Sequence, residues 1–227
     1  MLAPIPPHGG RSEPVDRRVP EPEVKDFLKF AEGLKRIAIS NGDLSTLNRI
    51  GDGGLSPLTG FMDRTTFDRV LEEERILRNG KVYAWTIPLS LPATDEEARA
   101  VKPGETVALV AESGAVAGPL KVADVFKFDK AKYNEVVYGT SRTDHPGARI
   151  VLDDPRAFLL GGEVRVLPQP IADFLEDRFE TDALRALLAV RGVRYSSLGP
   201  HSAGSSQVFL ADSAGNDGGA AGETVYA

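Results

Sequence analysis

Residues 51–62 read GDGGLSPLTGFM, a stretch in which glycine and proline alternate with the large apolar side chains of Leu55, Leu58, Phe61 and Met62. Surface turns use glycine and proline but rarely combine them with large apolar groups. We therefore expect a tight, non-repetitive loop whose apolar side chains point inward and which leads into a helix. Consecutive backbone N–H groups at residues 51–54 could instead bind phosphate, but the spacing matches neither a Walker loop nor a dinucleotide-binding fingerprint.

Shorter motifs flank this loop on both sides. PHGG at 7–10 and VDRRV at 15–19 precede it, and IPLSL at 87–91, YGT at 138–140, DHPG at 144–147 and LGG at 160–162 follow. In this order and at these spacings, the motifs resemble the beginning of the ATP sulfurylases, also called sulfate adenylyltransferases. The resemblance runs over residues 7–170.

The resemblance implies a PUA-like small β-barrel with short decorating helices, of the α+β or mainly β class, over residues 1–170. It implies a structural or interface role for the family-signature residues, which are Ser56, Pro57, Leu58, Gly60, Phe61, Met62, Gly139, Thr140, Asp144, His145, Pro146 and Gly147. The family's substrate is Mg-ATP, but the resemblance places no catalytic, substrate-binding, cofactor-binding or metal-binding residue in this chain.

ATP sulfurylases continue into a nucleotide-binding domain whose QTRNP-x-HRAH and GRDHAG motifs hold ATP and sulfate, and neither string occurs in residues 1–227. Residues 171–192 resemble only the lead-in to that domain. Residues 193–227 match nothing in the family. Because they are rich in Gly, Ser and Ala and poor in large apolar side chains, we expect them to be disordered. A reading-frame shift near Gly192, a truncation and sequence divergence are three alternative explanations of this pattern.

Composition excludes several classes of protein. With 41% hydrophobic and 26% charged residues, the chain is typical of globular domains, and it has no apolar run of the roughly 18 residues that span a bilayer. It also lacks a secretory signal, so we expect the cytoplasm. The absence of cysteine excludes disulfides and thiolate catalysis. A net charge of −6 argues against general nucleic-acid binding.

Hydrophobic periodicity predicts short helices followed by short strands. We expect helices over residues 22–34, after Asp43 as the N-cap, and after Asp63, where Phe67, Val70 and Leu71 should face inward. We expect strands at 82–85, 87–91, 105–110 and 120–128, and a last pair at 157–160 and 163–167 joined by a turn at Gly161 and Gly162. This pattern favours a small barrel over an alternating βαβ fold.

Few residues are candidates for a catalytic, metal-binding or anion-binding role. The histidines His8, His145 and His201 do not lie at metal-ligand spacing. His145 is expected to bond the local backbone in a turn or to contact a catalytic domain. Arg142 could bind an anion but is expected to be exposed to solvent. Ser56 could act as a nucleophile only beside a general base, and the sequence shows no such partner for it.

Three functional hypotheses follow. The chain belongs to an enzyme family but is expected to be inactive alone, its partner being the catalytic domain of the parent enzyme. Alternatively, it is a scaffold or oligomerisation module whose partner is a second copy. Either case predicts exposed apolar surface around residues 140–147 and 181–188. An RNA-binding module is disfavoured because the chain has no stripe of Lys and Arg with interleaved aromatic residues, and no membrane partner is expected.

Overall fold

The computed structural model describes residues 6–168 and residue 181. The chain divides into a main unit, Met1–Arg18 and Leu28–Val166, and a second unit, Val19–Phe27 and Leu167–Ala227. A 3₁₀ turn, η1 (Glu21–Glu23), precedes α1 (Val24–Glu32), in agreement with the helix expected from residue 22. The expected segments 171–192 and 193–227 lie outside the described residues except for Thr181. All elements below belong to the main unit.

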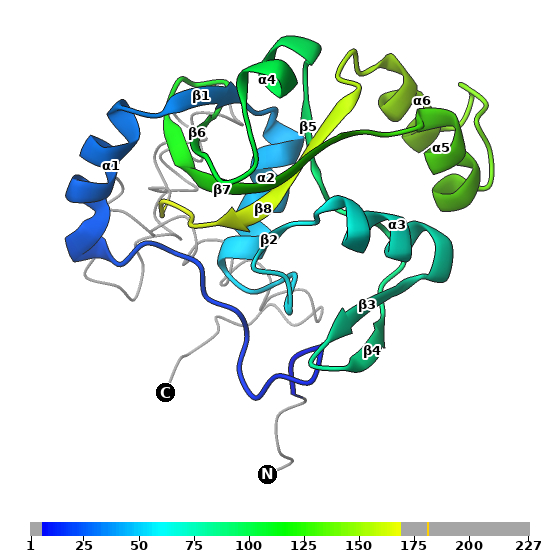
Figure 1. The fold of residues 1–227 in the computed structure, drawn as a ribbon, viewed down its shortest axis with the longest axis horizontal. Coiled ribbons are helices and arrows are strands. Elements are labelled where there is room, and N and C mark those ends of the chain that lie inside the picture. Colours follow the sequence, from blue (N-terminus) through cyan, green and yellow to red (C-terminus); the bar gives the residue numbers. More distant parts are fainter. Residues whose placement is uncertain (1–5, 169–180, 182–227) are drawn as a thin grey trace. The chain divides into compact units, whose positions relative to one another are not determined.

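A six-stranded sheet curls into half a barrel at the centre of the main unit (Figure 1). Its order is β1 (Lys35–Ala38), β6 (Thr106–Val110), β7 (Val116–Lys127), β8 (Phe158–Val164) and β2 (Gly60–Phe61), and β5 (Leu91–Ala93) pairs with β8 alone. The β1–β6 pair is parallel and the other pairs are antiparallel. A small curled sheet of short strands, rather than an alternating βαβ fold, agrees with the expectation from the sequence.

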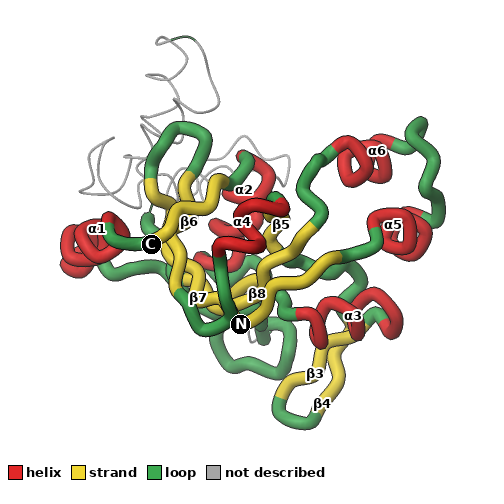
Figure 2. Tube along the Cα trace, turned by 45° about the horizontal axis from the view of Figure 1, so that its top comes forward, coloured by secondary structure: helices red, strands yellow, loops and turns green. Residues whose placement is uncertain are grey.

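Short helices and a separate hairpin surround this sheet (Figure 2). The helices are α2 (Asn41–Gly51), α3 (Arg64–Glu73), α4 (Asp95–Ala100), α5 (Lys130–Tyr138) and α6 (Pro146–Asp153), and the hairpin consists of β3 (Arg75–Arg78) and β4 (Lys81–Ala84). In both views the hairpin projects away from the six-stranded sheet below α3.

Two clusters of buried side chains form the core of the main unit. The larger contains Leu47 and Ile50 of α2 together with Leu109 and Leu120 of the sheet, all fully buried. The smaller joins α3 to the far end of β7 through aromatic rings. The ring of Phe67 lies 5.5 Å from Phe126 of β7 and 6.1 Å from Phe128 just beyond that strand, centroid to centroid, so both rings pack against α3.

The caps of α2 and α3 test two expectations. Asp63 caps α3 and accepts from the Thr66 N–H at 2.8 Å, as expected. Asp43 is not the N-cap of α2. That position belongs to Ser40, and Asp43 is the third helical residue of a reciprocal capping box, accepting from the Ser40 N–H at 3.0 Å. The expectation was wrong by one turn because both positions of a capping box favour side-chain oxygens.

The turn expected at Gly161 and Gly162 does not exist, because both glycines lie inside the continuous strand β8. They serve close packing instead. A Cβ on Gly161 would lie 2.5 Å from the Cα of Asp63, and one on Gly162 would lie 2.9 Å from the Ala123 nitrogen. Glycine within a strand often marks such a close backbone approach. The strand expected at 87–91 also begins only at Leu91.

Candidate functional site

Residues 51–62, here called the signature loop, are anchored through Ser56, whose side chain is buried. Its hydroxyl donates to the Gly53 carbonyl at 2.6 Å and accepts from the Val15 N–H at 2.8 Å. Gly53 has a φ of 84°, and a Cβ added to it would collide with the Val15 carbonyl, while a Cβ on Gly51 would lie 2.8 Å from Val166. Gly51 and Gly53 therefore allow Val166 and Val15, respectively, to pack closely on the loop. This packing explains why glycine occupies these positions without invoking a bound phosphate.

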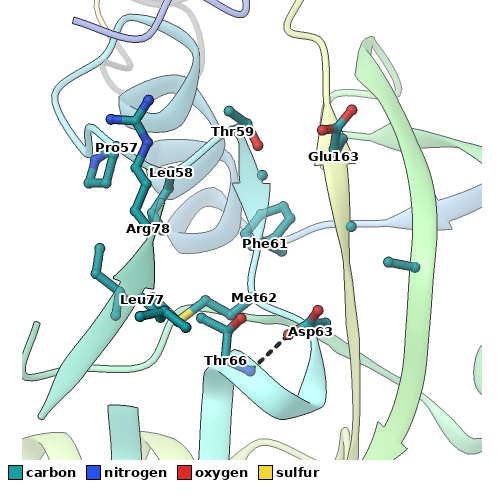
Figure 3. A pocket seen from close by; sticks show the side chains of 14 residues that line it. Pro57, Leu58, Thr59, Phe61, Met62, Asp63, Thr66, Leu77, Arg78 and Glu163 are labelled. Atoms are coloured by element: carbon teal, nitrogen blue, oxygen red, sulfur yellow. Dashed lines mark hydrogen bonds between the residues drawn. The ribbon is translucent and has the colours of Figure 1, made fainter. Parts of the chain in front are cut away.

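Beyond Ser56, the loop lines a cavity of about 350 Å³, here called the signature groove (Figure 3). One wall is the loop, with Pro57, Leu58, Gly60, Phe61 and Met62. The other walls come from β3, α3 and the sheet, with Ile76, Leu77, Arg78, Thr66, Gly162 and Glu163 among the lining residues. The expectation of inward apolar side chains is confirmed for Phe61 and Met62, which are almost fully buried.

Charges of both signs line the signature groove. Arg78 extends toward Pro57 in Figure 3 and donates from Nη1 to the Gly9 carbonyl at 2.8 Å. Asp63 caps α3, and Glu163 lies 3.7 Å from the guanidinium of Arg17. Carboxylates beside a single lining arginine do not suit a polyanion such as a nucleoside triphosphate.

The second set of signature residues forms the connection between α5 and α6. Gly139 ends α5 in the left-handed conformation with φ 68°, and the Thr140 hydroxyl accepts from the Arg142 N–H at 3.2 Å. Arg142 forms an ion pair with Asp144 at 2.6 Å, and both side chains are exposed. Arg142 is thus solvated, as expected, and its charge is already paired.

His145 begins α6 as its N-cap, with Pro146 directly after it. Its Nδ1 accepts from the Ala148 N–H at 3.2 Å, so the ring hydrogen lies on Nε2. The Tyr138 ring lies 5.1 Å from the His145 ring, centroid to centroid, with the two planes tilted by 37°, and a Cβ on Gly147 would lie 2.7 Å from the Tyr138 ring. The DHPG motif therefore caps and packs one helix against another, which confirms the expected bond to the local backbone.

Replacing the cap at His145 should lower stability measurably. His145→Ala leaves the Ala148 N–H without its side-chain acceptor, and we expect the free energy of unfolding to fall by about 1 kcal/mol. His145→Asn keeps a side-chain acceptor and should retain most of that stability. Urea unfolding of both variants checks this, and an equal loss in the two would contradict the capping role.

A third cluster, which the sequence did not indicate, joins Arg156 to Asp43 and Asp154 at 2.7 Å each. Burial alone would lower the pKa of Arg156, but the hydrogen bonds that Arg156 donates to the two carboxylates outweigh it and raise that pKa. Burial opposes the change at Asp154, where the hydrogen bonds from Arg156 prevail and lower the pKa of the carboxyl. Asp154 and Arg156 are two residues apart, but Asp43 lies 113 residues earlier, so no local motif could reveal the complete cluster.

The Arg156 cluster borders a cavity of about 240 Å³ with an aromatic wall. Phe67, Phe128 and Tyr133 line it, and the Phe67 and Tyr133 rings are stacked 6.2 Å apart. Burial, with a smaller effect of Tyr138, raises the pKa of Tyr133 to about 12. Tyr133 therefore stays neutral and acts here as an aromatic surface.

The structure separates the signature residues into two places, the signature groove and the α5–α6 connection. Within residues 6–168, no group of three or more His, Asp or Glu side chains is arranged to hold a metal ion. Nor is any helix in the described part of the chain long and apolar enough to cross a membrane.

Residues 5–169 match the family model of the PUA-like domain, and the chain belongs to this family. Its curated relatives are named sulfate adenylyltransferase. The one from Pyropia yezoensis is 51% identical over 188 residues, which cover 82% of this chain and 43% of the relative. The one from Symbiobacterium thermophilum is 37% identical over 194 residues, covering 86% and 48%. The resemblance seen in the sequence is thus confirmed.

A solved structure is also similar, described as a hexameric APS kinase from Thiobacillus denitrificans. The TM-score is 0.53 and the sequence identity 29%, and the match covers 83% of this chain and 32% of the other. This chain spans less than half the length of the curated relatives from Pyropia and Symbiobacterium.

Proposed function

We propose that this chain is the non-catalytic amino-terminal domain of a sulfate adenylyltransferase, the enzyme that joins ATP and sulfate to give adenylyl sulfate and diphosphate. The main support is the 51% identity to a named sulfate adenylyltransferase over only 43% of that relative. In this reaction a sulfate oxygen attacks the α-phosphorus of Mg-ATP, and the charge that develops needs preorganised cations and N–H groups.

The described residues offer a scaffold for that chemistry rather than the chemistry itself. The signature groove combines Arg78 with Asp63 and Glu163, and the Arg156 guanidinium is paired with carboxylates. The glycines of the signature loop serve packing. We therefore propose that the chain alone has no turnover and that a nucleotidyltransferase domain is its partner.

Apolar surface on α5 and α6 supports such a partner. Val136 is 47% exposed and Ile150 is 71% exposed. In the intervening loop the exposed side chains of Arg142, Thr143 and Asp144 are polar, so the large exposed aliphatic groups lie on the flanking helices α5 and α6. The expectation for residues 181–188 lies outside the described residues apart from Thr181. Large exposed aliphatic groups on adjacent helices are typical of a contact surface.

A phosphate-release assay tests the proposed lack of turnover. The purified chain with Mg-ATP and sulfate, coupled to pyrophosphatase, should release no sulfate-dependent phosphate, and titration calorimetry with Mg-ATP should show no stoichiometric heat. The full-length Pyropia relative in the same assay is the positive control. Sulfate-dependent turnover by this chain at a rate comparable to the control would refute the proposal.

Self-association is the second candidate function, supported by the same exposed side chains of Val136 and Ile150 and by the hexamer of the similar solved structure. Light scattering after size exclusion distinguishes the two candidates. An oligomer that Ile150→Glu dissociates, while Glu96→Ala on α4 does not, would favour assembly of identical copies. A monomer in both cases favours a separate catalytic partner.

A further inference from the structure

The β3–β4 hairpin has an unusually simple construction that leaves one edge open. Asn79 and Gly80, with φ angles of 50° and 73°, form a two-residue turn between Arg78 and Lys81. Positive φ at both turn residues is typical of the tightest hairpins. Four residue pairs in register follow from this turn, ending at Arg75 and Ala84.

The register determines which backbone groups point outward. Hydrogen-bonded and non-hydrogen-bonded pairs alternate along an antiparallel ladder. The Trp85 N–H donates to the Glu74 carbonyl at 2.8 Å, so this pair is a hydrogen-bonded one, and the Leu77–Val82 pair is not. The N–H and C=O of Leu77 therefore point away from β4, and no other segment in residues 6–168 pairs with β3. An edge of this kind is a template for another strand.

The open edge of β3 borders the signature groove. Ile76, Leu77 and Arg78 line this cavity of about 350 Å³ together with Pro57, Leu58 and Met62 of the signature loop. Leu77 is 52% exposed, and Val82, its cross-strand neighbour on the same hairpin face, is 58% exposed. An extended segment could thus find backbone partners and an apolar surface in one place.

Charge indicates what kind of segment fits. Residues 75–94 contain Arg75, Arg78 and Lys81 but no carboxylate, although the whole chain carries a net charge of −6. Arg78 uses Nη1 for the Gly9 carbonyl, and its Nε and Nη2 have no partner among the described residues. The two carboxylates that line the groove belong to other elements than the hairpin: Asp63 caps α3, and Glu163 lies in β8, 3.7 Å from the Arg17 guanidinium.

We propose that the open edge of β3, beside the signature groove, binds an extended segment of a separate partner protein as an added strand, and that this segment has alternating acidic and apolar residues, the acidic ones interacting with the basic residues of the hairpin. Main-chain hydrogen bonds would supply the affinity, and alternate side chains the specificity. The exposed hairpin face is aliphatic at Leu77 and Val82 and offers no stacking surface for nucleobases. This binding requires no nucleotide chemistry and is independent of the proposed enzyme family role.

Synthetic peptides test the mode of binding on the complete chain. A fluorescein-labelled hexapeptide of alternating Glu and Val should bind saturably by fluorescence anisotropy. The same peptide with N-methyl groups on alternate residues, which removes the pairing N–H groups, should bind about tenfold more weakly, as should the Lys–Val peptide of opposite charge. Equal binding of the N-methylated peptide, or no binding of the Glu–Val peptide, would overturn the proposal.

Substitutions then test the location. Leu77→Glu places a carboxylate at the open edge and should weaken binding of the Glu–Val peptide about tenfold. Val136→Glu on α5 is the control, because Val136 is similarly exposed in the wild type, and it should leave binding unchanged. Hydrogen exchange on the unmutated chain gives a second measurement, since the bound peptide should protect the Leu77 amide. Peptide binding that leaves this amide unprotected would contradict the location.

Two other occupants of the open edge would give different experimental results, and each result would overturn the proposal. A chain dimer that Leu77→Glu converts to a monomer would assign the open edge to a second copy. Salt-sensitive binding of oligouridine that displaces the Glu–Val peptide would assign the groove to nucleic acid.

Discussion

Gly162→Ala is expected to lower the free energy of unfolding by about 3 kcal/mol or more, the range of severe backbone and packing conflicts. The added Cβ would collide with the Lys121 carbonyl and lie 2.9 Å from the Ala123 nitrogen, both backbone atoms of β7. Its φ of 153° is also a conformation that residues with a Cβ rarely adopt. Because β7 and β8 form the centre of the sheet, neither strand can move aside without disrupting the other pairings.

Gly42→Ala is the matched control for this prediction. Gly42 lies in α2 with ordinary φ, and a Cβ there would lie 3.7 Å from the nearest atom, the Ser40 hydroxyl oxygen. Alanine favours helix over glycine by up to about 1 kcal/mol, so this variant should be equal to or more stable than the wild type. Urea unfolding measures both. If Gly162→Ala were as stable as Gly42→Ala, the close approach of β7 and β8 would be disproved.

Arg156→Met should lower the free energy of unfolding by about 3 kcal/mol, since removing one partner of a buried ion pair leaves uncompensated charge. The side chains of Arg156, Asp43 and Asp154 are only 18%, 12% and 24% exposed, so water cannot replace the lost partner fully. Arg149→Met is the control, because the Arg149–Asp153 pair is 67% and 66% exposed, and it should change stability by less than about 0.5 kcal/mol.

The effect of Arg156→Met should depend on pH. Arg156 holds the pKa of Asp154 below its ordinary value of 3.8, so its stabilisation is present at neutral pH and is lost as the pH falls from about 4 through the lowered pKa. In the variant, protonation relieves the unpaired carboxylates over the same range. The difference in unfolding free energy between wild type and variant should therefore be largest near pH 7 and shrink toward pH 3. A difference that is constant over this range would contradict the ion-pair explanation.

Local patterns in the sequence were sufficient for several elements. Asp63 followed by Phe67, Val70 and Leu71 predicted the cap and buried face of α3, because helix periodicity and capping are properties of neighbouring residues. The strands expected at 82–85 and 105–110 correspond to β4 and β6 for the same kind of reason. In contrast, β1, β3 and α4–α6 were not predicted, although α4 begins with a capping box of Thr94 and Glu97 that is visible in the local sequence.

The predictions were wrong where the same residues are compatible with two different local structures. Gly161 and Gly162 are typical of a turn, but inside β8 they allow the backbone of Asp63 and of β7 to approach. Asp43 is a good N-cap residue, but Ser40 occupies that position and Asp43 completes the capping box. For the two glycines the choice depended on backbone segments far along the chain, which a local pattern does not contain, whereas for Asp43 it depended on Ser40, only three residues earlier.

The sequence by itself determined the family, the short-element PUA-like architecture and the residues that carry the family signature, because these follow from motif order and local periodicity. Only the tertiary structure divided the signature residues between the groove beside β3 and the α5–α6 connection, and joined Arg156 to Asp43 across most of the main unit's sequence. The physical reason is that an open strand edge or a shared ion pair exists only after the sheet has brought distant segments within hydrogen-bonding distance.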